Sequence, residues 1–401
     1  METTICGISA MQYAMTPPLL RDVTLNPEDL RRSASAGGIS VPRRLFITRA
    51  DSRDADRLVR GRLCGELKGI SLPVQAYVGK GQSPRRSSCV AVRPREDERI
   101  LSHRMPLGNG LHVLSPEAAL CTISEGMSPI KLAELIFSAC GIYSLLPCTK
   151  RCQLAAEGLL SDGVLDATNF TYASILGYSD ERGVPLAHVD WAGNCLPWSP
   201  VFDRKGKLTN MWKRAPLTSV AEIARVADEF ELGPRHPLRR ALGMALNGSG
   251  SPAETKALLL LCSGVWNGGE SFGKPDLNRR VGFTREAGSL AHGNFCIADA
   301  LWVEHKRILE VNGTAFHADR DGFRISSGRT AALENMGYTV ANLLYEQMAD
   351  LELFDAVLPT LAEKLGFALQ KRTTAFLQRR NHLHKSLFGS QNTYMTGKTP
   401  L

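Results

Sequence analysis

The sequence predicts an α/β protein, with a mixed amino-terminal region followed by a second α/β domain that contains a β-hairpin. Three observations predict this class. Helical apolar spacing alternates along the chain with short β-branched runs, one tight hairpin carries acidic residues, and the composition is that of a globular protein. Of 401 residues, 43% are hydrophobic and 22% are charged. These values exclude wholesale disorder, and no apolar run is long enough for a membrane helix.

The amino-terminal region, residues 1–240, combines short strands and helices. The chain starts without a basic segment followed by a long apolar run, so we expect no secretory signal and a cytoplasmic protein. Strand patterns cover residues 43–50, 72–79 and 89–94, and helical patterns cover 16–32, 111–124 (after a short strand), 128–141 and 219–230. Ser115-Pro116 and Ser128-Pro129 each open a helix with Ser at the cap and Pro in the first turn.

A Gly/Ser break at 247–251 is the best candidate for a domain boundary. We therefore expect a first region over 1–240, a second domain over 250–352, and a helical basic tail over 353–401. The second domain should contain a helix at 251–264, strands at 295–303 and 308–313 joined by a tight turn, a helix at 329–337 and a strand at 338–345.

Positive charge is concentrated at the two ends of the chain. The net charge is +6 over residues 1–100, −2 over 251–350 and +4 over 351–401, within a total of +8. A basic surface favours polyanions through release of counterions. In the tail, Arg379, Arg380 and Lys385 are the candidates for contact with nucleic-acid phosphates. The alternative is that this basic helix simply has a solvated face, which is the commoner role of such a stretch.

Acidic residues on the hairpin point to a metal site. Asp299 lies on the first strand and Glu310 on the second, where acids on one face can reach the same ion. Oxygen ligands of this kind suit Mg²⁺ or Mn²⁺, and the chemistry they would serve is phosphodiester hydrolysis. Glu254 is a third candidate. It also fits a capping box with Ser251, and both roles can hold at once.

Each of three further residues has two possible roles. Asn312 is followed by Gly313 as in a turn, but its side-chain carbonyl can also coordinate a hard cation. His317 fits a general acid or base near a phosphate, or a surface histidine. Arg329 is expected to bind either a phosphate or an acid of its own domain.

The stretch ADALWVEHKRILEVNGTAFHADRDGFRISSGRTAALENMGYTV (298–340) resembles the restriction-endonuclease-like superfamily, and within it the very-short-patch-repair (Vsr-like) mismatch endonucleases. This resemblance implies an acid on a leading helix, an acid on the first hairpin strand and an E-x-D/E/K pair on the next. Glu254, Asp299 and Glu310 match these positions, and Phe316-His317 and Arg329 also fit. Asn312 departs from the pattern, since relatives usually have Asp or Lys there.

The amino-terminal region resembles, more loosely, the AbiEi-type antitoxins of abortive-infection systems. The resemblance is carried by SAMQYAMTPPLL, a basic loop with its following strand, and the stretch 110–145. It implies DNA binding, transcriptional autoregulation, a cognate toxin and a bacterial origin. The expected function is therefore a metal-dependent DNA endonuclease of the Vsr-like kind, in phage defence or DNA repair. The alternative is a non-catalytic, antitoxin-like DNA-binding regulator whose nuclease fold is degenerate.

Overall fold

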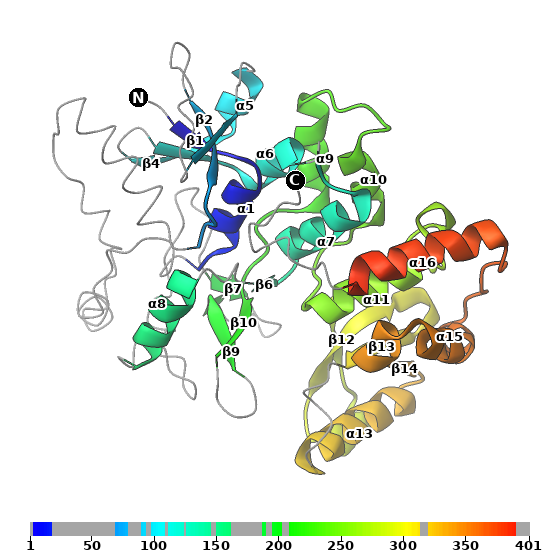
Figure 1. Ribbon diagram of the computed structural model, residues 1–401. Coiled ribbons are helices and arrows are strands. Elements are labelled where there is room, and N and C mark those ends of the chain that lie inside the picture. Colours follow the sequence, from blue (N-terminus) through cyan, green and yellow to red (C-terminus); the bar gives the residue numbers. More distant parts are fainter. Residues whose placement is uncertain are drawn as a thin grey trace. The chain divides into compact units, whose positions relative to one another are not determined.

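The computed structural model describes residues 3–17, 69–78, 90–93, 98–108, 111–123, 126–145, 150–161, 187–189, 195–202, 208–312 and 320–389. The strand expected at 43–50 and nearly all of 16–32 lie outside these ranges. The chain divides into two units (Figure 1). The first comprises the described parts of Met1–Met127 and Tyr143–Arg239, and the second comprises Ser128–Ile142 and the described parts of Arg240–Asn392. Both units combine helices with sheets, so the predicted α/β class is confirmed.

The first unit contains a five-stranded sheet of order β3-β2-β1-β5-β4 and a smaller sheet of order β6-β10-β9. Strand β1 is parallel to β5 and antiparallel to β2. The elements are β1 (Thr3–Ile5), α1 (Gly7–Met15), β2 (Val74–Val78), β3 (Val90–Arg93), α5 (Glu98–Ser102), β4 (Arg104–Gly108), β5 (Leu111–Leu114), α6 (Pro116–Ile123), β6 (Tyr143–Leu145), α8 (Lys150–Ser161), β7 (Ala187–Val189), β8 (Cys195–Pro197), β9 (Ser199–Phe202), β10 (Leu208–Lys213) and α9 (Val220–Glu229), followed by α10 (Pro237–Met244), in which the two units meet along the chain.

Helix starts in both units follow the predicted capping chemistry. The Ser115 hydroxyl accepts a hydrogen bond from the Ala118 amide at 3.3 Å. Ser128 caps α7 (Pro129–Cys140), which ends before Gly141 as expected. The expected strands within 72–79 and 89–94 are confirmed as β2 and β3. Short β-branched runs and Ser-Pro pairs are local signals, which is why they identify these elements without knowledge of the packing.

The second unit is built on a four-stranded sheet of order β11-β12-β13-β14. Strands β11, β12 and β13 are successively antiparallel, whereas β13 and β14 are parallel. The elements are α7, α11 (Pro252–Cys262), β11 (Asp276–Gly282), α12 (Arg285–Ala291), β12 (Phe295–Trp302), β13 (Arg307–Asn312), α13 (Arg320–Asn335), β14 (Thr339–Leu344), α14 (Tyr345–Ala349), α15 (Leu351–Leu365) and α16 (Thr374–Phe388), with short 3-10 turns η4 (Val265–Asn267) and η5 (Val303–His305).

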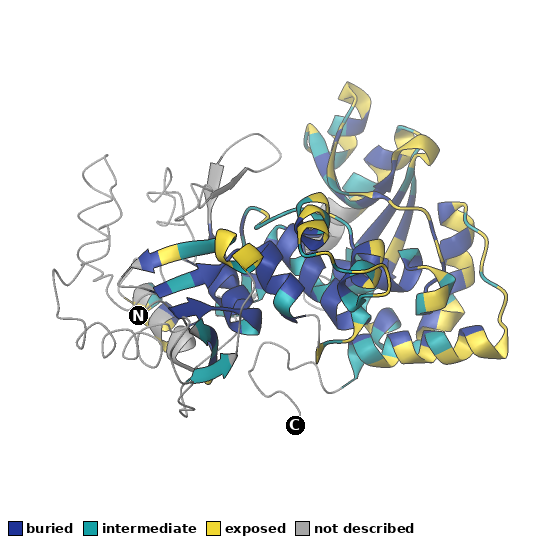
Figure 2. Cartoon of the chain, turned by 90° about the horizontal axis from the view of Figure 1, so that it is seen from above, coloured by how far each residue is buried: buried dark blue, intermediate teal, exposed yellow. Residues whose placement is uncertain are grey.

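Helices cover this sheet on both sides. In Figure 1, α11 and α16 lie above the sheet and α13 lies below it. Helix α15 contacts β13 and β14, and α13 packs on α12 and β14. Buried residues follow the strands and the inward faces of the helices (Figure 2). Within the described parts of the chain, no helix is long and apolar enough to cross a membrane.

The division of the chain differs from the expected one in two respects. Helix α7, expected in the first region, belongs to the second unit and contacts α11 and α16. The Gly/Ser break at 247–251 lies inside the second unit, not at a boundary, and the described part of the 353–401 tail packs into the same unit. Composition suggested a linker at 247–251, but hydrogen bonds to distant residues order this segment.

Arg380 is a correction to the predicted nucleic-acid surface. It is 1% exposed, and its guanidinium donates to Glu270, which is fully buried, and to Asp355. Glu270 also accepts a hydrogen bond from Arg372 at 2.7 Å and bonds Gln370. A buried carboxylate requires compensating charge, so Arg380 serves to neutralise Glu270 and cannot meet a phosphate in this fold.

We expect Arg380→Met to lower the free energy of unfolding by about 3–5 kcal/mol, because it leaves Glu270 buried with incomplete compensation. Urea denaturation followed by circular dichroism measures the change. Arg379→Met is the matched control, since Arg379 is only partly buried on the same helix. Equal losses for the two variants would contradict a special role for Arg380.

Candidate functional site

The three predicted acids come from three elements of the second unit. Glu254 lies in the first turn of α11, Asp299 in β12 and Glu310 in β13. Glu254 and Glu310 are buried and Asp299 is partly buried. The carboxylates are close enough that Glu254 and Glu310 each raise the pKa of Asp299. The Glu254 and Glu310 carboxylates therefore lie within electrostatic range of Asp299.

Asp299 lies where β12 and β13 separate. The paired register runs from Trp302 with Arg307 to Ala300 with Leu309, and stops one residue short of Asp299. Beyond this point the Asp299 carboxylate accepts a hydrogen bond from the Val311 amide at 2.7 Å. The side chain therefore takes the place of a strand partner, which keeps the Val311 amide satisfied and fixes the carboxylate next to Glu310.

Glu254 is held by two donors on one of its oxygens. Its Oε2 accepts from the Gly250 amide at 2.7 Å and from the Asn278 side-chain amide at 2.8 Å. Ser251 caps the helix as predicted, through the Glu254 amide at 3.2 Å, but the Glu254 carboxylate reaches Gly250 and not the cap amide. A Cβ at position 250 would lie 2.9 Å from an Asn278 side-chain atom, so only glycine fits here without a shift.

The loop before α11 is fixed by residues far away in the sequence. The Gly248 amide donates to the Cys140 carbonyl at 3.0 Å, and the Ile142 amide donates to the Ser249 carbonyl at 2.9 Å. The Asn278 amide nitrogen also donates to the Gly248 carbonyl at 2.9 Å. The end of α7 and strand β11 therefore set the position from which Glu254 enters the site.

Asn278 is a site residue that the sequence analysis missed. Its backbone has a positive φ of 48°, a conformation that Asn tolerates better than most residues. The register of β11 with β12 sets Asn278 opposite Asp299, since Leu277 pairs with Ala300 and Arg279 with Ala298. Its side chain then turns to Glu254. A single Asn in an irregular strand carries no periodic signal, so only the fold reveals this role.

Glu310 has a basic partner on one oxygen and none on the other. Arg329 of α13 forms an ion pair with its Oε2, so Arg329 binds an acid of its own domain, one of its two predicted roles. Oε1 of Glu310 is buried and has no hydrogen-bond partner among the residues that the structure describes. A buried carboxylate oxygen left without a donor is costly, and a cation is one way to satisfy it.

The electrostatics of the acids follow from burial and mutual repulsion. Burial, then Glu254 and Glu310, raise the pKa of Asp299 well above its ordinary range, against the Val311 hydrogen bond and Arg329. Burial raises the pKa of Glu310 to about 7, although Arg329 lowers it. Acids with raised pKa values are common at functional sites because ionisation is left for a ligand to stabilise.

Asn312 is engaged with a side chain of the neighbouring strand β14. Its side-chain nitrogen donates to the side-chain oxygen Oδ1 of Asn342 at 3.3 Å, and Asn342 pairs in register with Glu310 across β13 and β14. Among the residues that the structure describes, no three His, Cys, Asp or Glu side chains form a ready metal-binding group. Asp299 and Glu310 suit a hard cation, and the orphaned Glu310 oxygen fits one.

The remaining predicted residues are dispersed. His317 lies outside the described residues. On α16, Arg379 donates to the Val265 carbonyl at 3.1 Å and its guanidinium lies over the Trp266 ring, while Lys385 is exposed. These residues do not join the acids. Comparison of the chain with family models, with curated proteins and with solved structures finds no match.

The raised pKa of Glu310 predicts a pH dependence of stability. The unfolded state releases this proton near pH 4.5 and the folded state near 7, so the free energy of unfolding of metal-free protein should fall across that interval. The loss should be roughly 3 kcal/mol. Urea denaturation of the parent and Glu310→Gln from pH 4 to 8 measures it, and the difference between them should shrink below pH 4.5.

Glu304→Gln is the control for this measurement, because Glu304 is exposed on the turn of the same hairpin. It should keep the pH dependence of the parent. A Glu310→Gln variant whose stability declines as steeply as the parent between pH 4.5 and 7 would show that Glu310 ionises normally.

Proposed function

We propose that the second unit is a metal-dependent DNA endonuclease of the Vsr-like kind. The observation that carries the proposal is the electrostatic proximity of Glu254 and Glu310 to Asp299, with Oε1 of Glu310 buried and without a hydrogen-bond partner in the described part of the chain. A fold does not normally bury several carboxylates around an unsatisfied oxygen for stability alone, since such groups weaken the folded state. A divalent cation would offset the free-energy cost of burying these carboxylates.

The order of elements supports the same proposal. A leading helix with Glu254, a hairpin with Asp299 and Glu310 on adjacent strands, a helix with Arg329 and a final parallel strand follow one another in the second unit. The resemblance to restriction-endonuclease-like proteins implies the three acids and the arginine helix in this order. Strand β11 and helix α12, which the sequence analysis did not anticipate, lie between the first helix and the hairpin.

Each residue has a distinct part in the proposed reaction. Asp299 and Glu310 hold Mg²⁺ or Mn²⁺, and Glu254 supports it through water. The cation, when bound, lowers the pKa of a water and neutralises charge on the phosphate. Arg329 supplies positive charge beside the carboxylates for the same phosphate, and His317 assists proton transfer. Asn312 contributes at most a neutral carbonyl, which weakens the site relative to an acid.

Two observations favour a second candidate, a non-catalytic DNA-binding regulator of the antitoxin type with a cognate toxin. Asn312 bonds Asn342, and Arg329 forms an ion pair with Glu310. A degenerate nuclease site would be stabilised in this way. Such a regulator would bind DNA but would not cleave it.

Cleavage of plasmid DNA by the full chain, with Mg²⁺ or Mn²⁺ and with a chelator, tests the proposal. Asp299→Asn keeps the hydrogen bond from Val311 but removes a charge, so cleavage should fall about a hundredfold or more. Its metal-free affinity for DNA should hold or rise because repulsion of phosphates is reduced. Glu304→Gln, exposed on the same hairpin, should cleave like the parent.

Asn312→Asp provides the companion measurement. If the site is merely weakened, a restored acid should increase metal-dependent cleavage or lower the metal concentration that it requires. Absence of cleavage of any DNA or RNA by both the parent and Asn312→Asp would rule out the nuclease and leave the regulator.

A further inference from the structure

Strand β11 links the acid cluster to an exposed basic edge. It is the first strand of the order β11-β12-β13-β14, so one side of it is an edge of the sheet. Asn278 of this strand bonds Glu254, and the next two residues, Arg279 and Arg280, are both exposed. Arg285, at the start of α12, is exposed as well. Cations thus lie one and two residues along the chain from a residue of the site.

Exposed charges differ between the two sides of the sheet: β11 and the start of α12 expose three arginines beside Asp276 and Glu286, whereas the residues that follow β14 expose acids. At the β14 edge, the chain continues directly into α14 and α15, where Glu346, Asp350 and Glu352 are exposed. A polyanion is repelled from that edge and attracted to the β11 edge. Because the acid cluster lies between the two edges, a polyanion reaches it more favourably from the β11 side.

Arg280 is also held in place for recognition. Its guanidinium lies 4.6 Å from the centre of the Phe295 ring. Arg279 has a single ion pair, 3.2 Å to Asp276, between two half-exposed side chains, a contact that phosphate can displace at little cost. A planar guanidinium with a restricted side chain suits bidentate contact with a phosphate.

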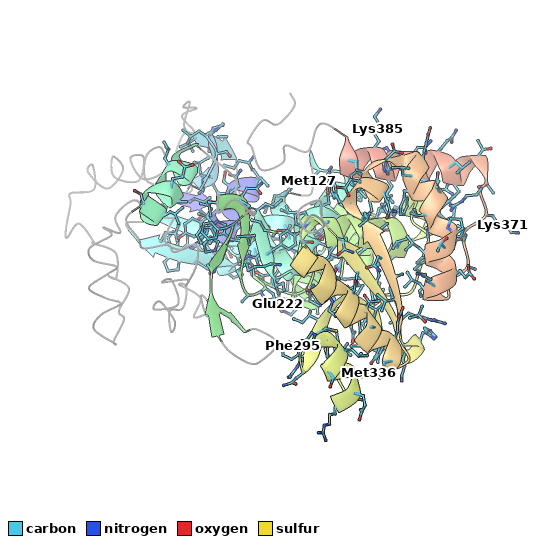
Figure 3. The ribbon with its side chains drawn as sticks, turned by 90° about the horizontal axis from the view of Figure 1, so that it is seen from below. Met127, Glu222, Phe295, Met336, Lys371 and Lys385 are labelled. Carbon is cyan, nitrogen blue, oxygen red and sulfur yellow. The ribbon has the colours of Figure 1, made fainter. Side chains whose placement is uncertain are left out.

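Helix α16, the surface expected from the sequence, is less suited to this role. Arg380 is buried against Glu270, and Arg379 is engaged with Val265 and Trp266. Only Lys385 of the predicted trio is exposed. In Figure 3, Phe295, beside Arg280, and Lys385 lie at separate ends of the second unit. The two surfaces can therefore be tested independently.

We propose that Arg279, Arg280 and Arg285 form the phosphate-binding surface of the second unit, along which the backbone of duplex DNA runs from the β11 edge to the acid cluster. This inference rests on the proposed function for the identity of the polyanion. The proposed phosphate contacts therefore lie on β11 and α12, whereas the sequence predicted them on α16.

The test uses full-length protein carrying Asp299→Asn, so that bound DNA is not cut, and a fluorescent duplex in chelator. Binding is measured by anisotropy over a range of salt concentrations. Replacing Arg279, Arg280 and Arg285 by Ala should weaken binding at least tenfold. The slope of log affinity against log salt should become shallower by about 2–3, as expected for three lost phosphate contacts.

The matched control replaces Lys364, Lys371 and Lys385 by Ala, which removes the same charge from exposed positions of the α15–α16 region. It should bind DNA within about twofold of its parent, since surface charges far from the ligand are screened. Equal melting temperatures for both triple variants and the parent verify folding.

Each outcome distinguishes this inference from the proposed function. An arginine variant that binds like its parent, or a lysine variant that loses as much affinity, overturns the β11 surface even if the wild-type chain cleaves DNA. A wild-type chain that never cleaves, but whose binding depends on the three arginines, overturns the nuclease and supports the surface. Dependence of binding to duplex RNA alone on these arginines would overturn DNA as the ligand.

Discussion

Repulsion among buried carboxylates is the constraint around which the second unit is organised. Glu254 raises the cost of ionising both Asp299 and Glu310, Glu310 also raises that of Asp299, and each of the three carboxylates has different hydrogen-bonding partners. A backbone amide of β13 bonds the first, an arginine of α13 pairs with the second, and two donors hold the third. Strand separation, helix placement and the loop before α11 all follow from the need to keep these groups together.

The same unit contains a second buried carboxylate that is treated differently. Glu270 is fully buried, and it is surrounded by the arginines of the α16 segment and by Gln370. Its charge is balanced by protein alone, so it stabilises the packing of α16. Within the described ranges, Glu310 pairs with Arg329 and its other oxygen has no hydrogen-bond partner. Glu270 thus has a structural role, whereas Glu310 keeps an oxygen that a ligand could bind.

Local patterns predicted the acids but not their surroundings. Asp299 and Glu310 were found because an acid within an apolar strand is conspicuous, and Glu254 because it follows a Ser-Pro helix start. Strand β11 was missed because DLNRRVG lacks alternation of apolar residues. Asn278 was missed because its partners depend on the fold. Arg380 was assigned to the surface because helical spacing cannot reveal a buried Glu270 distant in sequence.

The position of α7 has a consequence for how the chain is made. This helix precedes most of the first unit's carboxyl-terminal half, yet its apolar face packs with α11 and α16. During synthesis it emerges roughly a hundred residues before α11 and roughly two hundred before α16, so its apolar face stays uncovered until these helices are made. Neither unit is continuous along the chain, so a cut at any single peptide bond cannot yield both units whole. Glu254, whose loop is bonded to the end of α7, depends on a segment translated long before it.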